Sequence, residues 1–151
     1  MRKLCMAFSI LIVILLYFAV NVFSAGTVSV STSRASGNVW ITTYTCTADS
    51  SDGSFPATDS DVAINGYVFL VVTNPGATAP TDDYDITLTD SDSVDVMGGT
   101  LANRDTANSE QAVPYIGSVY GSRFVSGVLT ATITNNSENS AIVEIIVYFY
   151  R

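Results

Sequence analysis

Three aspartates near the middle of the chain have the spacing of oxygen ligands for a metal ion. Asp90, Asp92 and Asp95 place three carboxylates within a stretch of six residues. Carboxylates in a loop suit Ca²⁺, although this stretch lacks the glycine and the terminal bidentate glutamate of an EF-hand loop. Aspartates also cap the backbone N–H groups of tight turns. The pattern leaves two interpretations: a calcium site at these three residues, or an Asp-rich turn without a metal.

Paired carboxylates are also the main route to catalysis that this composition offers. A glycosidase-type pair of acids can be drawn from two clusters, Asp82, Asp83 and Asp85, and Asp90, Asp92 and Asp95; replacing Asp82, Asp85, Asp90 and Asp92 would test it. These residues fall in expected turns, where aspartate is common because it caps the backbone. A carboxylate-dependent hydrolase is therefore our third hypothesis. We expect no catalytic residue, no cofactor other than the calcium considered above, and no enzymatic activity.

Other catalytic and metal-binding side chains are scarce. The sequence has no histidine, its one lysine is Lys3, and its cysteines are Cys5 and Cys46. Beyond the N-terminal segment, no serine has a histidine or lysine to activate it, and a zinc site lacks ligands. A single remaining cysteine forms no disulfide within the domain. Cys46 is interpreted as a buried small hydrophobe, and a reactive thiol is the alternative.

The first 24 residues have the composition of an export signal. They open with Arg2-Lys3, continue with an almost unbroken apolar run to Val20, and end in small residues around Ser24. We predict a signal peptide at residues 1–24. A retained membrane anchor is the alternative, because the apolar run approaches the roughly 20 residues that span a bilayer. One domain at residues 25–151 is then exported to the periplasm, the exterior or the cell envelope, and it meets the membrane only through an uncleaved N-terminal segment.

Charge in the rest of the chain is one-sided. Four arginines and all 14 acidic residues lie beyond residue 24, which gives a formal charge of −10. Such a domain repels phosphate backbones, so we expect no nucleic-acid partner. Acidic side chains also keep β domains apart in solution, and this is the simpler reason for the composition.

Alternating β-branched and aromatic residues predict extended structure along most of the domain, and no segment has a sustained helical period. We expect an all-β domain with a β-sandwich or jelly-roll-like fold of about seven or eight strands. The first strand is expected at a sheet edge and the last at a sheet centre. Strands are expected at residues 27–33, 38–48, 62–73, 84–90, 94–97, 127–134 and 141–150, with a short extended stretch at 112–124.

Several of these strands make more specific predictions. Residues 84–90 and 94–97 are expected to form one hairpin, and residues 127–134 and 141–150 another. Gly66 predicts a bulge or bend in its strand.

Side-chain alternation also predicts which faces are buried. Trp40 and Tyr44 share one face of their strand, and that face is expected to point inward. The consecutive apolar residues Val68–Val72 predict a strand that is covered on both of its faces.

Tyrosines form a second group of interest. Their rings offer either a face for stacking sugars or contacting proteins, or simple packing of the core and the hairpins. The tyrosines in question are Tyr67, Tyr84, Tyr115, Tyr120, Tyr148 and Tyr150.

A long stretch of the chain resembles a known group of sequences. The segments that carry the likeness are 66–67, 71–90, 94–96, 98–99, 101–106 and 108–111, and the likeness extends from residue 62 to residue 151. This stretch is similar to one that recurs in small β-rich proteins encoded near bacteriophage or prophage structural genes. The resemblance implies a virion-associated protein, and it brings no assigned activity and no catalytic residues.

Two functional hypotheses follow. The first is a non-enzymatic structural or accessory protein of a phage particle, which assembles with copies of itself or with other proteins through sheet edges. The second is an exported binding or adhesion module of the cell envelope. Its contact surface would be the loops at residues 49–60, 77–83 and 100–111, because loops on a rigid scaffold carry recognition.

Overall fold

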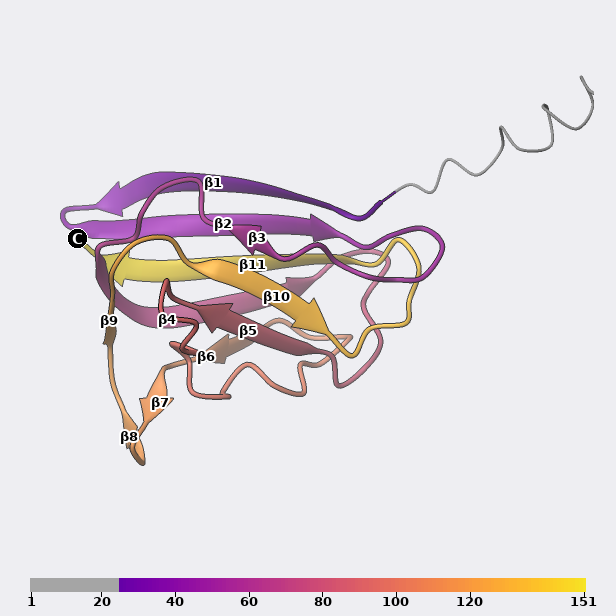
Figure 1. The fold of residues 1–151 in the computed structure, drawn as a ribbon. Coiled ribbons are helices and arrows are strands. Elements are labelled where there is room, and N and C mark those ends of the chain that lie inside the picture. The colour runs from indigo at the N-terminus through magenta and orange to yellow at the C-terminus, as the bar shows by residue number, and fades with distance from the viewer. Residues whose placement is uncertain (1–24) are drawn as a thin grey trace, which may run out of the picture.

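The structure, a computed structural model, describes residues 25–151 of the chain (Figure 1). Its regular elements are all β-strands, which confirms the expected all-β class. No helix in these residues is long and apolar enough to cross a membrane. The predicted signal peptide or anchor at residues 1–24 lies outside the described residues, so that segment and the domain boundary at residue 25 stay predictions.

Two sheets and a small separate hairpin make up the fold. The larger sheet has the strand order β1-β2-β11-β4-β6, and β9 also pairs with β4. The second sheet has three strands in the order β3-β10-β5. The hairpin consists of β7 and β8, which pair only with each other. Of the eleven strands, six have five residues or more and five have only two or three, against the seven or eight strands expected. The strands are β1 Thr27–Ser36, β2 Val39–Thr47, β3 Thr58–Asp59, β4 Gly66–Pro75, β5 Asp85–Thr89, β6 Glu110–Ala112, β7 Tyr115–Ile116, β8 Val119–Tyr120, β9 Arg123–Val125, β10 Thr130–Thr134 and β11 Ile142–Tyr150.

Strand β11 lies at the centre of the larger sheet, between β2 and β4, as its apolar sequence predicted. Its alternate side chains are fully buried, from Val143 to Phe149, and they point toward the three-stranded sheet. That sheet lies in front of the larger one in Figure 1. It contributes Ile86, Leu88 and Ile133 to the same buried cluster, so one core lies between the two sheets.

The inward face predicted for β2 is confirmed. Tyr44 and Cys46 are buried in the core, and Trp40 packs against the core while remaining partly exposed. The first strand, β1, lies at the sheet edge as expected.

One predicted hairpin forms in part and the other is wrong. The segment at 94–97 turns back on residues 84–90 through the bridge between Thr89 and Asp95 and a hydrogen bond from the N–H of Val96 to the carbonyl of Leu88 at 2.8 Å, but the strand that pairs along β5 is β10. The strands β10 and β11 belong to different sheets. The connection between β10 and β11 is held by Asn136, whose amide donates to the carbonyl of Gly53 and accepts from the N–H of Thr81. These contacts keep the connection at the end of the molecule, where the chain passes from one sheet to the other and does not fold back as a hairpin.

The bulge predicted at Gly66 lies three residues further along. Tyr148 pairs with Leu70 and Phe149 pairs with Val68, which leaves Phe69 as the extra residue of β4. Gly66 has a different role, because a Cβ atom there would lie 2.2 Å from the carbonyl oxygen of Tyr150. Glycine at this position lets two backbones approach closely.

The outer edge of β1 is capped at one point. The carboxylate of Asp61, which follows β3, accepts hydrogen bonds from the N–H of Thr32 at 3.0 Å and from the Thr32 hydroxyl. A side chain from the loop that follows β3, a strand of the smaller sheet, therefore binds the edge of the larger sheet.

Tyr44 joins the two sheets through the core. Its hydroxyl donates to the carbonyl of Leu129 at 2.6 Å, and the same carbonyl accepts the N–H of Ser60 at 2.9 Å. A second buried tyrosine, Tyr84, lies near Thr73. The hydroxyl groups of Tyr84 and Thr73 are buried without a partner of acceptable hydrogen-bond geometry.

We expect these two tyrosines to respond differently to loss of the hydroxyl. Tyr44→Phe removes a satisfied buried hydrogen bond and should lower the free energy of unfolding by about 1 kcal/mol. Tyr84→Phe, the matched control, removes an unsatisfied hydroxyl and should cost less than about 0.5 kcal/mol or stabilise the fold. Urea unfolding of both variants measures this difference. An equal or larger loss in Tyr84→Phe would contradict the assignment.

Burial of Cys46 should make stability fall at alkaline pH. Burial raises the pKa of its thiol to about 12, so the folded state keeps a proton that the unfolded chain releases from about pH 8.5 upward. The stability that the buried, protonated Cys46 thiol contributes is therefore complete below the pKa of the unfolded chain, and it is lost as the pH rises above that value. Cys46→Ala should be less stable than the native protein at pH 7, and the difference should shrink by on the order of 1 kcal/mol by pH 10. A constant difference in urea unfolding across this range would refute the expectation.

Candidate functional site

The aspartates with metal-ligand spacing are engaged with the backbone. Asp90 accepts the N–H groups of Asp92 and Val94, each at 3.0 Å. Asp95 accepts the N–H groups of Met97 at 3.0 Å and Gly99 at 2.7 Å. In residues 25–151, no group of three or more histidine, cysteine or acidic side chains is arranged to hold a metal ion. The turn-capping interpretation accounts for two of the three carboxylates, and the calcium site at Asp90, Asp92 and Asp95 stays a prediction.

A calcium titration tests that prediction. A site at these residues should raise the thermal midpoint in millimolar Ca²⁺, because a ligand that binds only the folded state stabilises it. Asp92→Asn should abolish the rise, and it leaves the two capping carboxylates intact. Equal thermal midpoints of the native protein with Ca²⁺ and with EDTA would leave the turn as the sole role of the three aspartates.

Two further aspartates of the hydrolase hypothesis also serve as caps. Asp82 accepts the N–H of Thr106 at 3.3 Å, and Asp85 accepts the N–H of Asn103 at 2.9 Å. Both contacts hold the loop at residues 100–111 against the start of β5.

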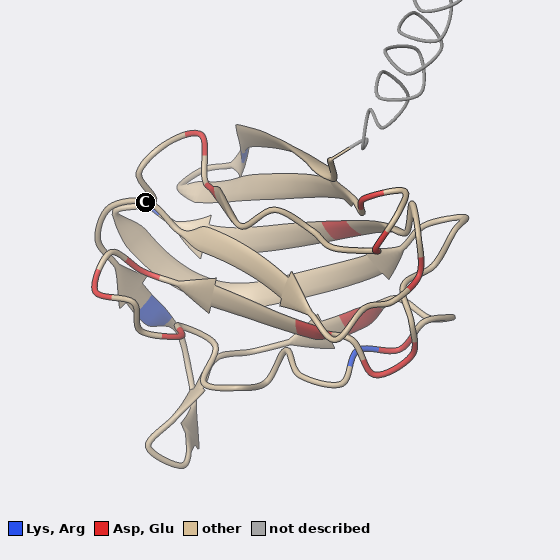
Figure 2. Cartoon of the chain, turned by 45° about the vertical axis from the view of Figure 1, so that its right-hand side comes forward, with Lys and Arg blue, Asp and Glu red and all other residues tan. Residues whose placement is uncertain are grey.

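The three loops of the binding-module hypothesis are brought together. Asn136 contacts two of them, at Gly53 and Thr81, and the Thr106 hydroxyl donates to the carbonyl of Pro80 at 2.6 Å, which adds the third. The Ser51 hydroxyl and N–H hold the pKa of Asp49 below its ordinary value. Figure 2 shows that many of the acidic residues lie in loops at the ends of the strands.

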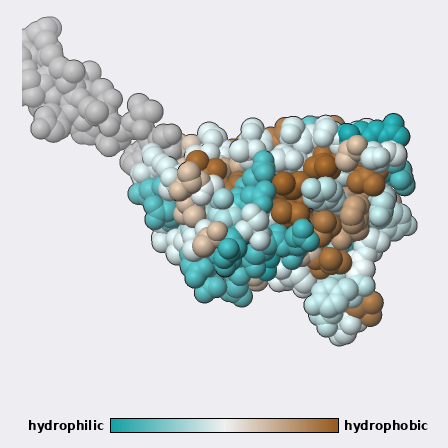
Figure 3. Space-filling view, turned by 180° about the vertical axis from the view of Figure 1, so that it is seen from behind, coloured by the Kyte–Doolittle hydropathy of each residue, from teal (hydrophilic) through white to brown (hydrophobic). Residues whose placement is uncertain are grey.

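The predicted tyrosine group divides between core and surface. Tyr84 is fully buried, whereas Tyr67 and Tyr150 are 51% and 41% exposed. Tyr67, Tyr148 and Tyr150 lie on the side of the larger sheet that faces away from the core, because their strand neighbours point inward. This side is seen in Figure 3 as a broad hydrophobic area.

Strand register assembles the apolar side chains of this surface into rows. Tyr150 pairs with Val39 and Tyr67, and the next row toward the centre of β11 pairs Tyr148 with Ile41 and Leu70. The bulge residue Phe69 stacks on the ring of Tyr150, with 4.4 Å between ring centroids. We call the following residues the apolar face: Val39, Ile41, Tyr67, Phe69, Leu70, Val72, Phe124, Ile146, Tyr148 and Tyr150.

The apolar face contains no charged side chain. Along β11 the next residue on this side is Glu144, which pairs with Thr45 and Asn74 and accepts from the Asn74 amide at 3.2 Å. The prediction that Val68–Val72 is covered on both faces holds for the core side. On the other side, nothing in residues 25–151 covers it, and Val72 and Leu70 remain partly exposed. The unbroken apolar run was thus the sequence signal for this surface.

A short hairpin at one side carries further exposed apolar side chains. Tyr115 pairs with Tyr120, Ile116 pairs with Val119, and the connecting residues have φ angles of 57° and 66°, which suit a type I′ turn. Val119 and Tyr120 are 67% and 69% exposed. Adjacent side chains of a strand point in opposite directions, so both faces of the hairpin are open. We call Tyr115–Tyr120 the hairpin arm.

A comparison with known proteins adds one distant likeness. No protein-family model and no curated protein matches the sequence. Among solved structures, the chain is similar to a chain of the Cyanophage Pam1 capsid asymmetric unit, with a TM-score of 0.40 and 20% sequence identity, over 84% of this chain and 86% of that one.

Proposed function

We propose that the protein is a non-enzymatic structural or accessory subunit of a particle, of the virion-associated kind that the sequence resemblance implies. Its two sheets would form a jelly-roll-like sandwich that serves as a scaffold. The observation that supports this proposal is the apolar face, an uncharged surface on a domain with a formal charge of −10. Large exposed apolar patches on soluble proteins mark contact sites for other macromolecules.

Charge distribution explains why such a surface suits assembly. Copies of an acidic domain repel each other where their aspartate-rich loops meet. The apolar face lacks that repulsion, so contacts there gain the full benefit of burying Tyr148, Leu70 and their neighbours. The same charge disfavours a nucleic-acid partner.

The state of association tests the proposed function. The full chain is produced in a bacterial host and purified with the N-terminus that it acquires there. We expect oligomers in sedimentation measurements, and we expect higher salt to strengthen them, because salt screens the acidic repulsion and leaves apolar contacts intact. A monomer at all salt concentrations, up to hundreds of micromolar protein, would oppose the proposal.

The exported binding module remains the second candidate, and the gathering of the three loops through Asn136 and Thr106 favours it. It predicts a monomer recovered from the periplasm or the medium with a processed N-terminus. Cell fractionation with N-terminal sequencing therefore separates the two candidates.

A further inference from the structure

The hairpin arm is tied to the body of the domain at its base. The rings of Tyr115 and Tyr120 lie 4.6 Å apart, and the base is fixed by hydrogen bonds from Tyr115 N–H to the Met97 carbonyl and from Gly121 N–H to the Pro114 carbonyl. At Gly98, a Cβ atom would lie 2.0 Å from the Tyr115 carbonyl oxygen, so glycine is needed for this contact. These contacts fix the place and direction in which the arm leaves the body.

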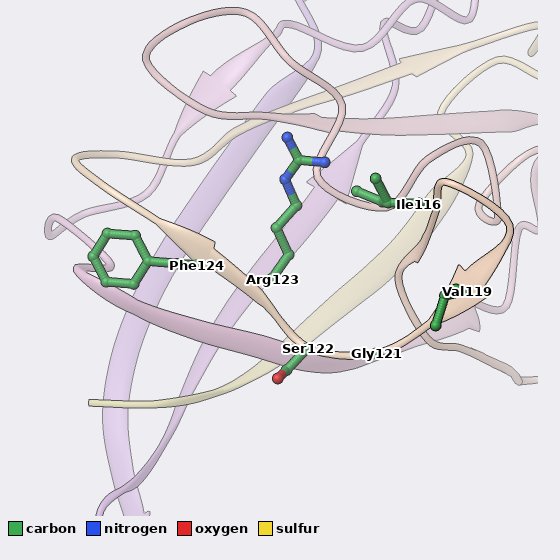
Figure 4. Close-up of a pocket in the computed structure, with 6 residues that line it drawn as sticks. All are labelled: Ile116, Val119, Gly121, Ser122, Arg123 and Phe124. Atoms are coloured by element: carbon green, nitrogen blue, oxygen red, sulfur yellow. The ribbon is translucent and has the colours of Figure 1, made fainter.

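The arm also stands away from the body of its own chain. In Figure 1, β7 and β8 project beyond both sheets. A hollow of about 480 Å³ separates the arm from β9 and is lined by Ile116, Val119, Gly121, Ser122, Arg123 and Phe124. Figure 4 shows Phe124 leaving β9 on the side opposite to Arg123. Because Phe124 also packs edge-on against Tyr67 at 5.2 Å, the hollow borders the apolar face.

Two-residue strands gain little stability from pairing alone. The exposed side chains of the arm are therefore better explained by a contact than by folding. The chain from Gln111 to Ser122 contains no charged residue, and the apolar face contains none. On an acidic domain without lysine beyond residue 24, these are two surfaces that a second copy can approach without repulsion.

We propose, on the basis of the function proposed above, that the hairpin arm of one copy docks on the apolar face of a second copy beside Phe124. The arm is convex and the surface next to Phe124 is hollowed, so the two contacting surfaces differ in shape. Such a contact is heterologous: each copy offers an arm to one neighbour and a face to another, and repetition produces a ring or an extended array.

Complementation between two variants tests this geometry. The arm variant is Val119→Ser with Tyr120→Ser, and the face variant is Tyr67→Ser with Tyr150→Ser; all four side chains are more than 40% exposed. Each variant alone should associate at least about tenfold more weakly than the native chain, as loss of central interface residues does. An equimolar mixture should form one-to-one pairs and no larger species, because one intact arm meets one intact face. Sedimentation measures all of these states, and circular dichroism with thermal unfolding checks each fold.

The control is Val62→Ser with Val94→Ser, which replaces two exposed valines in loops outside both surfaces and should associate like the native chain. If the native chain assembles and either test variant assembles equally well, the arm-to-face contact is wrong while the proposed function stands. Loss of association in both variants without pairing in the mixture would also overturn it, in favour of a symmetric contact. A native chain that stays monomeric refutes the proposed function itself.

Discussion

The two-residue alternation of side chains along β11 is the constraint on which the rest of the structure depends. Its inward positions, Val143 to Phe149, complete the core, and the intervening positions, Ile146 to Tyr150, form the centre of the apolar face. A slip of one residue in register would exchange the two sets. The hydrogen bonds that pair β11 with β2 and β4 therefore position both the hydrophobic core and the surface that we propose for contact.

Backbone close approaches fix the position of this surface. Gly66 allows β4 to begin against the carbonyl of Tyr150, and the bulge at Phe69 then turns an additional ring toward the outside. As a result, the consecutive residues Phe69 and Leu70 both lie on this side, where a regular strand would have placed only one of them, and Phe69 stacks on Tyr150. Gly98 has a comparable role at the base of the hairpin arm. Neither glycine marks a flexible hinge; each permits two backbone segments to touch.

Sequence reasoning was accurate where local chemistry decides the outcome. The strands around Tyr44, Val71 and Val147 were placed correctly, because β-branched and aromatic runs have few alternatives to extended structure. The choice of strand partner was not local: the path from β10 to β11 depends on Asn136 and its contacts with distant loops. The tyrosines were recognised as a group, but alternation alone does not tell which side of a sheet another layer covers. The run Val68–Val72 indicated two covered sides, and the described chain supplies a cover for one.

The carboxylate of Asp61 limits how this protein can polymerise. The outer edge of β1 is ten residues long, and a free edge of that length templates the addition of further strands, which is the route to amyloid-like fibres. By occupying the N–H of Thr32, Asp61 interrupts the template near its middle with a negative charge. A second strand that approaches this edge therefore meets a position that is already occupied, and this disfavours growth strand by strand.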